Sequence, residues 1–132
     1  STVKVLPFRS STRVEERNGR TFTVEPKSRD VPVPPEVLAI VRRGMLEAVE
    51  GEKGTGRAAR VAGVRVAGKT GTAQNPHGEH HAWFVAFAPY EDPTVALAVV
   101  VEHAGHGGAV AAPIAGKVLS AYFSEQQVAE GR

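Results

Sequence analysis

Two apolar segments joined by a short link constrain the fold of this chain most strongly. Residues 81–88 and 94–102 are almost wholly apolar, and only residues 89–93 separate them. A parallel crossover needs a dozen or more residues, so the second segment must return antiparallel to the first. Both segments are apolar along their whole length, which predicts cover on both faces of this hairpin. With 132 residues and no cysteine, the chain is expected to form one hydrophobic core without disulfide bonds.

Other segments add a second hairpin, a third strand and two helices. Asn18-Gly19 is a strong two-residue hairpin signal, because both turn positions need positive φ. A helix over residues 36–50 is expected to bury one apolar face. That face consists of Val37, Leu38, Val41, Met45, Leu46 and Val49. The prediction is an α+β fold, an antiparallel sheet packed by a C-terminal helix and by the helix near 36–50, with an N-terminal hairpin. Its three main strands are residues 61–73, 81–89 and 94–103.

Charge and hydropathy exclude several classes of function. The basic residues of the N-terminal half are interleaved with acidic ones, so no nucleic-acid partner is predicted. The longest apolar runs are far shorter than the roughly 20 residues of a membrane helix. No basic-then-apolar leader opens the sequence, so any anchor or export signal is expected to lie outside this chain. No cofactor is predicted.

A phosphate-loop pattern, G-x-x-x-x-G-K-[ST], is matched by Gly63, Gly68, Lys69 and Thr70. Such a loop needs a helix that begins at the lysine and turns its free N–H groups toward the phosphates. Residues 64–66 favour a strand instead, and the glycine and proline between residues 71 and 76 oppose a helix. A nucleotide-binding function is therefore the weakest alternative.

Five histidines raise the alternative of a metal site. His77, His80 and His81 form one group, while His103 and His106 lie further along the chain. Imidazoles are good zinc ligands, but neither group has the spacing of a rigid ligand pair. We therefore predict no metal and expect solvent-facing loop histidines, although the sequence leaves metal binding by the first group open.

The segment Lys69-Thr70-Gly71-Thr72 carries more coherent chemistry. At the end of a strand it offers a cation, two hydroxyls and a glycine, which together suit an extended peptide added to the sheet edge. The hydroxyls of Thr70 and Thr72 would hold a carboxylate, and the Thr72 N–H would serve half of an oxyanion hole. Gly71 would let the peptide backbone come close. The alternative is an ordinary strand end with a surface lysine.

Several further motifs occur in a fixed order around this segment, and together they resemble the C-terminal part of class B penicillin-binding proteins, most closely the type called penicillin-binding protein 2. The dense resemblance runs from Gly54 to Phe123, with a looser one from Glu36. Its motifs are Gly54-Thr55-Gly56, Val66–Gln74, His81-Ala82-Trp83-Phe84, Phe87-Ala88-Pro89, Val100-Val101-Glu102, Gly107-Gly108 and Ala111-Ala112-Pro113-Ile114.

The resemblance implies a peptidoglycan D,D-transpeptidase, a serine acyl-transfer enzyme that beta-lactams inhibit. It implies catalytic roles for Lys69, Thr70, Gly71 and Thr72, and substrate binding by Thr70, Thr72 and Gln74. Such enzymes use three motifs, S-x-x-K, S-x-N and K-T-G, and only K-T-G stands here in its family context. No S-x-N occurs in the chain. The alternative from another class is a non-catalytic module that binds peptide termini or assists assembly.

The letters Ser1-Thr2-Val3-Lys4 spell S-x-x-K, which raises the alternative that Ser1 is a nucleophile and Lys4 its base. That motif must open a helix so that Ser and Lys share one face. Because Pro7 follows one turn later, we expect no such helix and no nucleophile in this chain.

We therefore expect one partial domain over residues 1–132, inactive alone. Its parts are a strand and surface hairpin (1–33), a helix and loop (34–60), and the K-T-G sheet with the C-terminal helix (61–125). The expected partners are the D-Ala-D-Ala stem peptide, beta-lactams and a missing N-terminal part of the domain. Strand 94–102 is expected to expose an open apolar edge, which would favour self-association. The intact protein would act at the extracytoplasmic face of the bacterial membrane.

Overall fold

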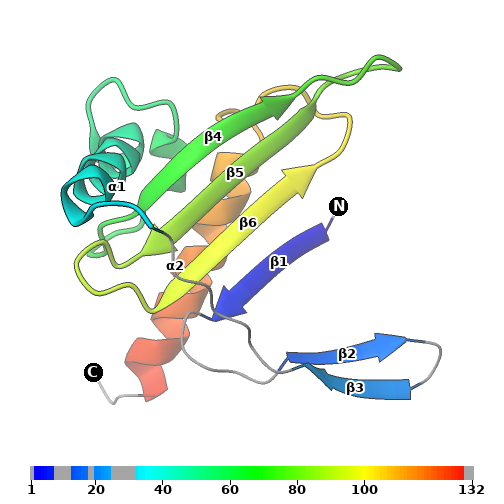
Figure 1. Cartoon of the computed structure of the whole chain (residues 1–132), viewed down its shortest axis with the longest axis horizontal. Coiled ribbons are helices and arrows are strands. Elements are labelled where there is room, and N and C mark those ends of the chain that lie inside the picture. Colours follow the sequence, from blue (N-terminus) through cyan, green and yellow to red (C-terminus); the bar gives the residue numbers. More distant parts are fainter. Residues whose placement is uncertain (1, 8–12, 18–19, 25–31, 130–132) are drawn as a thin grey trace.

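The chain folds around a main antiparallel sheet, with one helix behind the sheet and another beside it (Figure 1). The computed structural model describes residues 2–7, 13–17, 20–24 and 32–129, and the side chains of residues 32–128. The elements are β1 (Thr2–Pro7), β2 (Arg13–Arg17), β3 (Arg20–Val24), α1 (Pro35–Glu50), the short 3₁₀ helix η1 (Arg57–Ala59), β4 (Ala67–Ala73), β5 (His81–Ala88), β6 (Val95–Val101) and α2 (Ala111–Ala129).

The main sheet has the strand order β1-β6-β5-β4, and all three pairings are antiparallel. The expected hairpin of two apolar segments is confirmed as β5 and β6, with Phe84 opposite Val99 and Ala86 opposite Leu97. Strands β2 and β3 form the second expected hairpin as a separate two-stranded sheet.

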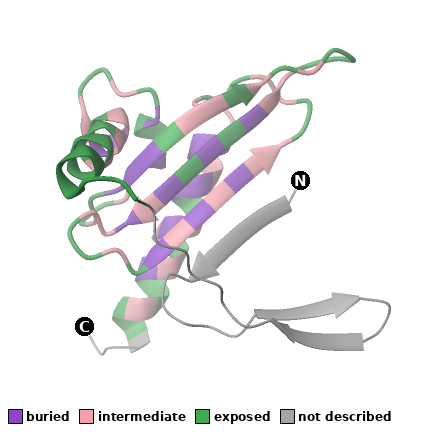
Figure 2. Cartoon of the chain, viewed as in Figure 1, coloured by how far each residue is buried: buried purple, intermediate pink, exposed green. Residues whose placement is uncertain are grey.

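The core lies between the main sheet and α2. Alternate residues of β5 are buried, and the purple bands along β5 in Figure 2 follow this alternation. The sheet-facing stripe of α2 repeats every four residues as Ala111, Ala115, Leu119 and Phe123, all buried. The small residues near the start of α2 let it approach the sheet closely. Within the described ranges, neither helix has the length and apolarity to cross a membrane.

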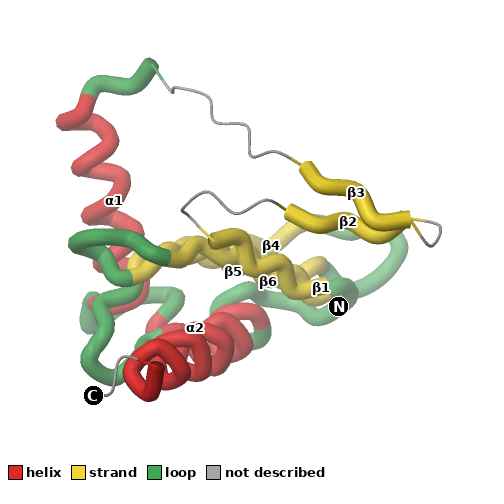
Figure 3. Tube along the Cα trace, turned by 90° about the horizontal axis from the view of Figure 1, so that it is seen from below, coloured by secondary structure: helices red, strands yellow, loops and turns green. Residues whose placement is uncertain are grey.

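The prediction of cover on both faces of the β5–β6 hairpin is wrong for the middle of β5. Trp83 and Val85 point away from α2 and are each 39% exposed. Figure 3 shows why: α2 lies along one face of the sheet, whereas α1 stands at the end of the sheet and rises away from the other face. The described part of the chain therefore fully covers only one face.

Only the C-terminal half of α1 buries its apolar face. Leu46 and Val49 are buried, and Met45 is half-buried, as expected. Val37, Leu38 and Val41 are 44%, 51% and 53% exposed, contrary to the prediction of one continuous buried face. The periodicity identified the helix correctly, but only its last turns reach β4 and η1 (Figure 3).

The third strand begins later than predicted. Residues 61–64 form a turn, in which the Val64 N–H donates to the Val61 carbonyl, and residues 65–66 lead into the strand without belonging to it. Gly63 at the tip has a φ of 74°, a left-handed conformation that interrupts extended backbone. The strand β4 starts at Ala67.

The edge of β6 that was expected to be open is paired. Strand β1 lies along it, from Thr2 opposite Val100 to Pro7 opposite Val95 (Figure 1). The prediction of an open edge was wrong, because the first residues of this chain satisfy the unpaired N–H and C=O groups that β6 would otherwise present. The predicted self-association through strand 94–102 thereby loses its physical basis.

The burial of the α2 side chains predicts which substitutions in this helix lower the stability of the fold. Leu119 is fully buried, so Leu119→Ala should lower the free energy of unfolding by about 2–5 kcal/mol through lost burial and a cavity. Val128 lies on the same helix at 79% exposure, and Val128→Ala should stay within about 0.5 kcal/mol of the parent. Urea unfolding monitored by circular dichroism measures both. Equal midpoints for the two variants would contradict this core.

Candidate functional site

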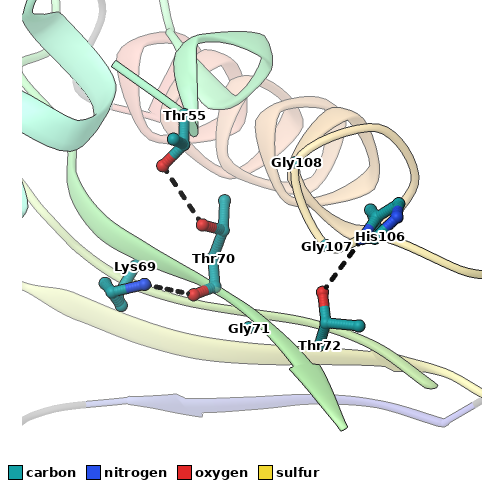
Figure 4. Close-up of a pocket in the computed structure, with 8 residues that line it drawn as sticks. All are labelled: Thr55, Lys69, Thr70, Gly71, Thr72, His106, Gly107 and Gly108. Atoms are coloured by element: carbon teal, nitrogen blue, oxygen red, sulfur yellow. Dashed lines mark hydrogen bonds between the residues drawn. The ribbon is translucent and has the colours of Figure 1, made fainter. Parts of the chain in front are cut away.

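A cavity of about 470 Å³ opens where three segments meet beside β4 (Figure 4). One wall is β4 itself, the second is the loop after α1, and the third is the loop between β6 and α2. The lining residues are Thr55, Lys69, Thr70, Gly71, Thr72, His106, Gly107 and Gly108. All four residues of the predicted K-T-G-T segment thus lie at one cavity.

The position of β4 suits the addition of a peptide strand. It is an edge strand of the main sheet, so within the described residues one of its two sides has no neighbouring strand. Thr70 and Thr72 are two residues apart and therefore project from the same face, toward the cavity. Lys69 is exposed, and its Nζ donates a hydrogen bond to the Thr70 carbonyl oxygen at 2.6 Å.

Thr55 brings a third hydroxyl to the cavity. Its Oγ1 lies 3.1 Å from Thr70 Oγ1, across the gap between the loop after α1 and β4. The loop is anchored by the Gly56 N–H, which donates to the Ala48 carbonyl at 2.7 Å. The Arg60 guanidinium donates to the carbonyls of Val49, Glu50 and Gly51, the unpaired end of α1. Thr55 therefore sits on a loop tied to a helix end.

His106 reaches the same cavity from another loop and contacts Thr72, whereas Thr55 contacts Thr70. The His106 Nδ1 lies 3.4 Å from Thr72 Oγ1 (Figure 4). The neighbouring Gly107 is buried and packs against β4 and β5. A Cβ at this position would lie 2.5 Å from the Gly71 carbonyl oxygen and would collide with the Trp83 carbonyl oxygen. The loop can carry His106 to Thr72 only because residue 107 has no side chain.

The other histidines form a separate network beyond the cavity. The His103 N–H donates to His81 Nδ1 (3.1 Å), and the Asn75 N–H donates to His80 Nδ1 (3.4 Å). Asn75 Nδ2 lies 3.0 Å from His103 Nδ1. The His80 carbonyl accepts from the N–H groups of Ala104 and Gly105. This network ties the β4–β5 turn to the loop that carries His106. Among the described residues, no group of three or more His, Asp or Glu side chains is placed to hold a metal ion.

The charge of the cavity favours anions. Among the residues whose side chains are described, no acidic group lines it, and Lys69 and His106 are the only titratable groups that do. Three hydroxyls, from Thr55, Thr70 and Thr72, provide further donors. A carboxylate is the complementary ligand.

The structure separates the predicted site residues into two sets. Lys69, Thr70, Gly71 and Thr72 line the cavity, whereas Gln74 follows β4, is exposed and is not among the lining residues. Ser1 falls outside the described residues. Residues Thr2–Pro7 form a strand and no helix, so the geometry that S-x-x-K needs is not present there. Lys69 lies within β4 and does not begin a helix, which removes the basis of the phosphate-loop alternative.

Sequence reasoning missed the contributions of Thr55 and His106. The Gly54-Thr55-Gly56 and Gly107-Gly108 motifs were visible as part of the family resemblance, but no residue in them had an assigned role. His106 was weighed only as a metal ligand. Their positions depend on long-range packing, and the local signal for them is the glycines on either side of Thr55 and of His106.

Comparisons with known proteins find a matching family and similar structures. The family model described as the penicillin binding protein transpeptidase domain matches residues 10–120. The peptidoglycan D,D-transpeptidase MrdA of Haemophilus influenzae is 41% identical in an alignment of 110 residues, and the match covers 70% of this chain. The chain spans only 17% of that relative's length.

Two solved structures are also similar. The D,D-transpeptidase domain of a peptidoglycan glycosyltransferase from Eggerthella lenta matches with a TM-score of 0.66 and 37% identity, over 84% of this chain and 26% of that one. The imipenem acyl-enzyme complex of penicillin-binding protein A from M. tuberculosis matches with a TM-score of 0.62 and 35% identity. That match covers 79% of this chain and 23% of the other.

The close contact at Gly107 generates a prediction. Gly107→Ala should displace the loop that carries His106, change the amide chemical shifts of Thr72 and Gly71, and destabilise the fold by about 1–3 kcal/mol. Gly44 in α1 is the matched control, since nothing lies within 4 Å of a Cβ built there. Gly44→Ala should raise stability by about 0.4–1 kcal/mol. NMR spectra and urea unfolding measure both variants, and an unshifted Thr72 amide in Gly107→Ala would refute the contact.

Proposed function

Because this chain belongs to the penicillin-binding protein transpeptidase family, we propose that it supplies the K-T-G wall of the active site of a serine-type peptidoglycan D,D-transpeptidase. The observation that carries the proposal is the cavity at β4, an edge strand that presents Lys69, Thr70, Gly71 and Thr72, where no acidic side chain of residues 32–128 lines the cavity. The chain spans 17–26% of the relatives named above, so the reaction as a whole is proposed for the intact protein.

The proposed substrate is the D-Ala-D-Ala end of a stem peptide, bound in extended form along β4. Thr70 and Thr72 donate hydrogen bonds to its terminal carboxylate, and Lys69 contributes positive charge. Gly71 lets the peptide backbone approach the strand. The Thr72 N–H provides one of two donors to the oxyanion that forms at the scissile carbonyl. Gln74 is proposed to contact the substrate beyond the cavity.

The covalent step requires a serine from outside the described residues. Its Oγ attacks the carbonyl carbon of the penultimate D-Ala, the peptide C–N bond breaks, and the terminal D-Ala leaves with a proton on its amine. An amine of a neighbouring stem peptide then attacks the acyl-enzyme, forms the cross-link and releases the serine. A beta-lactam would acylate the same serine, as imipenem does in the M. tuberculosis structure. We propose that the intact protein acts at the extracytoplasmic face of the membrane, where peptidoglycan is cross-linked.

Substitutions on β4 test the proposed wall. In a complete transpeptidase domain that contains this chain, Lys69→Ala and Thr70→Val should each lower the acylation rate with a fluorescent penicillin by about 10²–10³, the cost of one lost active-site donor. His77, exposed and outside the cavity, is the control position, and His77→Gln should acylate at the parent rate. Unchanged acylation in the β4 variants would remove these residues from the active site.

The 132-residue chain alone tests the missing nucleophile. It should form no covalent adduct with a fluorescent penicillin, because residues 2–7 form a strand where S-x-x-K needs a helix. Gel fluorescence after denaturation measures this. An adduct that disappears in Ser1→Ala would overturn the expectation and assign the nucleophile to Ser1. Reversible binding of an acyl-D-Ala-D-Ala peptide without acylation, in the complete domain, would instead favour the non-catalytic peptide-binding module.

A further inference from the structure

His106 faces Thr72 across the cavity, and nothing in the proposed function yet uses it. The imidazole comes from the loop between β6 and α2, and the hydroxyl comes from β4 (Figure 4). The Nδ1–Oγ1 distance of 3.4 Å makes this a long hydrogen bond, beyond the roughly 2.7–3.2 Å typical of N–H···O bonds. Of the five histidines, His106 alone lines the cavity.

The chemistry of a threonine hydroxyl makes this contact consequential. The hydroxyl has one proton to donate and can accept two hydrogen bonds. If the Thr72 proton points to Nδ1, it is not available to a ligand. If His106 carries its proton on Nδ1 and donates it to Thr72 Oγ1, the Thr72 proton is free to point into the cavity. The protonation of Nδ1 thus decides which way the hydroxyl donates.

The loop holds His106 firmly enough for such a role. The His106 carbonyl accepts from the N–H groups of Ala109 and Val110, and the Gly107 carbonyl accepts from the Ala112 N–H at 2.8 Å. Upstream, the N–H groups of residues 103–105 donate to His81 and His80. These bonds tie the loop both to the β4–β5 turn and to the start of α2.

The surroundings favour an anionic ligand at this hydroxyl. In the described part of the chain, the only other titratable group that lines the cavity is Lys69, and its Nζ already contacts the Thr70 carbonyl. A carboxylate at Thr72 would therefore depend on hydroxyl donors whose protons point toward it. A bound carboxylate in turn favours the imidazole form with a proton on Nδ1, since that form leaves the Thr72 proton free.

We propose that His106 is a positioning residue for substrate selection: its Nδ1–H donates to Thr72 Oγ1 and directs the Thr72 proton to the terminal carboxylate of a D-Ala-D-Ala peptide. This inference rests on the proposed function, which supplies the carboxylate. It assigns His106 a share in the preference for a peptide acid over the corresponding peptide amide. It assigns no covalent step to His106.

The test compares two ligands that differ only at this end, N-acetyl-D-Ala-D-Ala and its C-terminal amide. NMR titration of the 132-residue chain gives both dissociation constants, and their ratio is the acid preference. His106→Leu should lower this preference about three- to tenfold, as expected for one net hydrogen bond. Binding of the amide should change little. His77→Leu is the matched control and should keep the parent preference.

Two further variants separate positioning from a merely structural role. The side-chain amide of asparagine can place an N–H where Nδ1 lies, whereas that of glutamine reaches one bond further. His106→Asn should therefore restore most of the acid preference, and His106→Gln should resemble His106→Leu. This comparison also decides the matter if His106→Leu does not fold. Equal preferences in the asparagine and glutamine variants would overturn the hydrogen-bond role.

The outcomes distinguish this inference from the proposed function. If the parent chain shows no acid preference, both fall. If the parent prefers the acid, Thr70→Val abolishes the preference and His106→Leu retains it, the proposed wall stands and the role of His106 is overturned. If His106→Leu and Thr70→Val both reduce the preference and His77→Leu does not, both are supported.

Discussion

The buried ring of Phe84 connects the hydrophobic core to the cavity. It belongs to β5, is fully buried, and packs in the cluster that includes Leu119 of α2. Two glycines also lie against the ring. A Cβ at Gly68 would come within 2.5 Å of the ring, and a Cβ at Gly56 within 2.9 Å. The residue just before the K-T-G wall and the loop that carries Thr55 therefore both pack against one core side chain. Because interiors are close-packed, a change of core volume there is transmitted directly to the site.

The main elements follow from local pattern, and the departures follow from long-range packing. The short link after Ala88 was sufficient to predict the antiparallel pairing of β5 with β6. The periodicity of α1 identified the helix, but exposure of Val37 and Leu38 depends on where the sheet ends, which periodicity does not encode. The pairing of β1 with β6 joins residues nearly a hundred positions apart. Gly63 delayed the start of β4, because a single left-handed residue outweighs the alternation around it.

The site residues likewise fall into those that a local pattern predicts and those that depend on long-range packing. Lys69, Thr70, Gly71 and Thr72 are adjacent in sequence, so a motif on one strand was enough to place them together. Thr55 and His106 come from two loops 14 and 34 residues away from Lys69 and Thr72, and meet β4 only after the core has formed. The glycines beside them gave a usable signal. Repeated glycines flanking a polar residue indicate close backbone approach, as Gly107 over Gly71 illustrates.

The two threonines of β4 have different partners, and this difference makes the two sides of the cavity chemically distinct. Thr70 meets another hydroxyl, Thr55, so either oxygen of that pair can donate and the pair can adapt to a ligand. Thr72 meets an imidazole nitrogen, whose protonation fixes which way its own hydroxyl donates. One side of the cavity is thus adaptable and the other is set by a single proton on His106. A carboxylate that spans both hydroxyls would bind best when that proton lies on Nδ1, because both hydroxyls then have a hydrogen to donate to it.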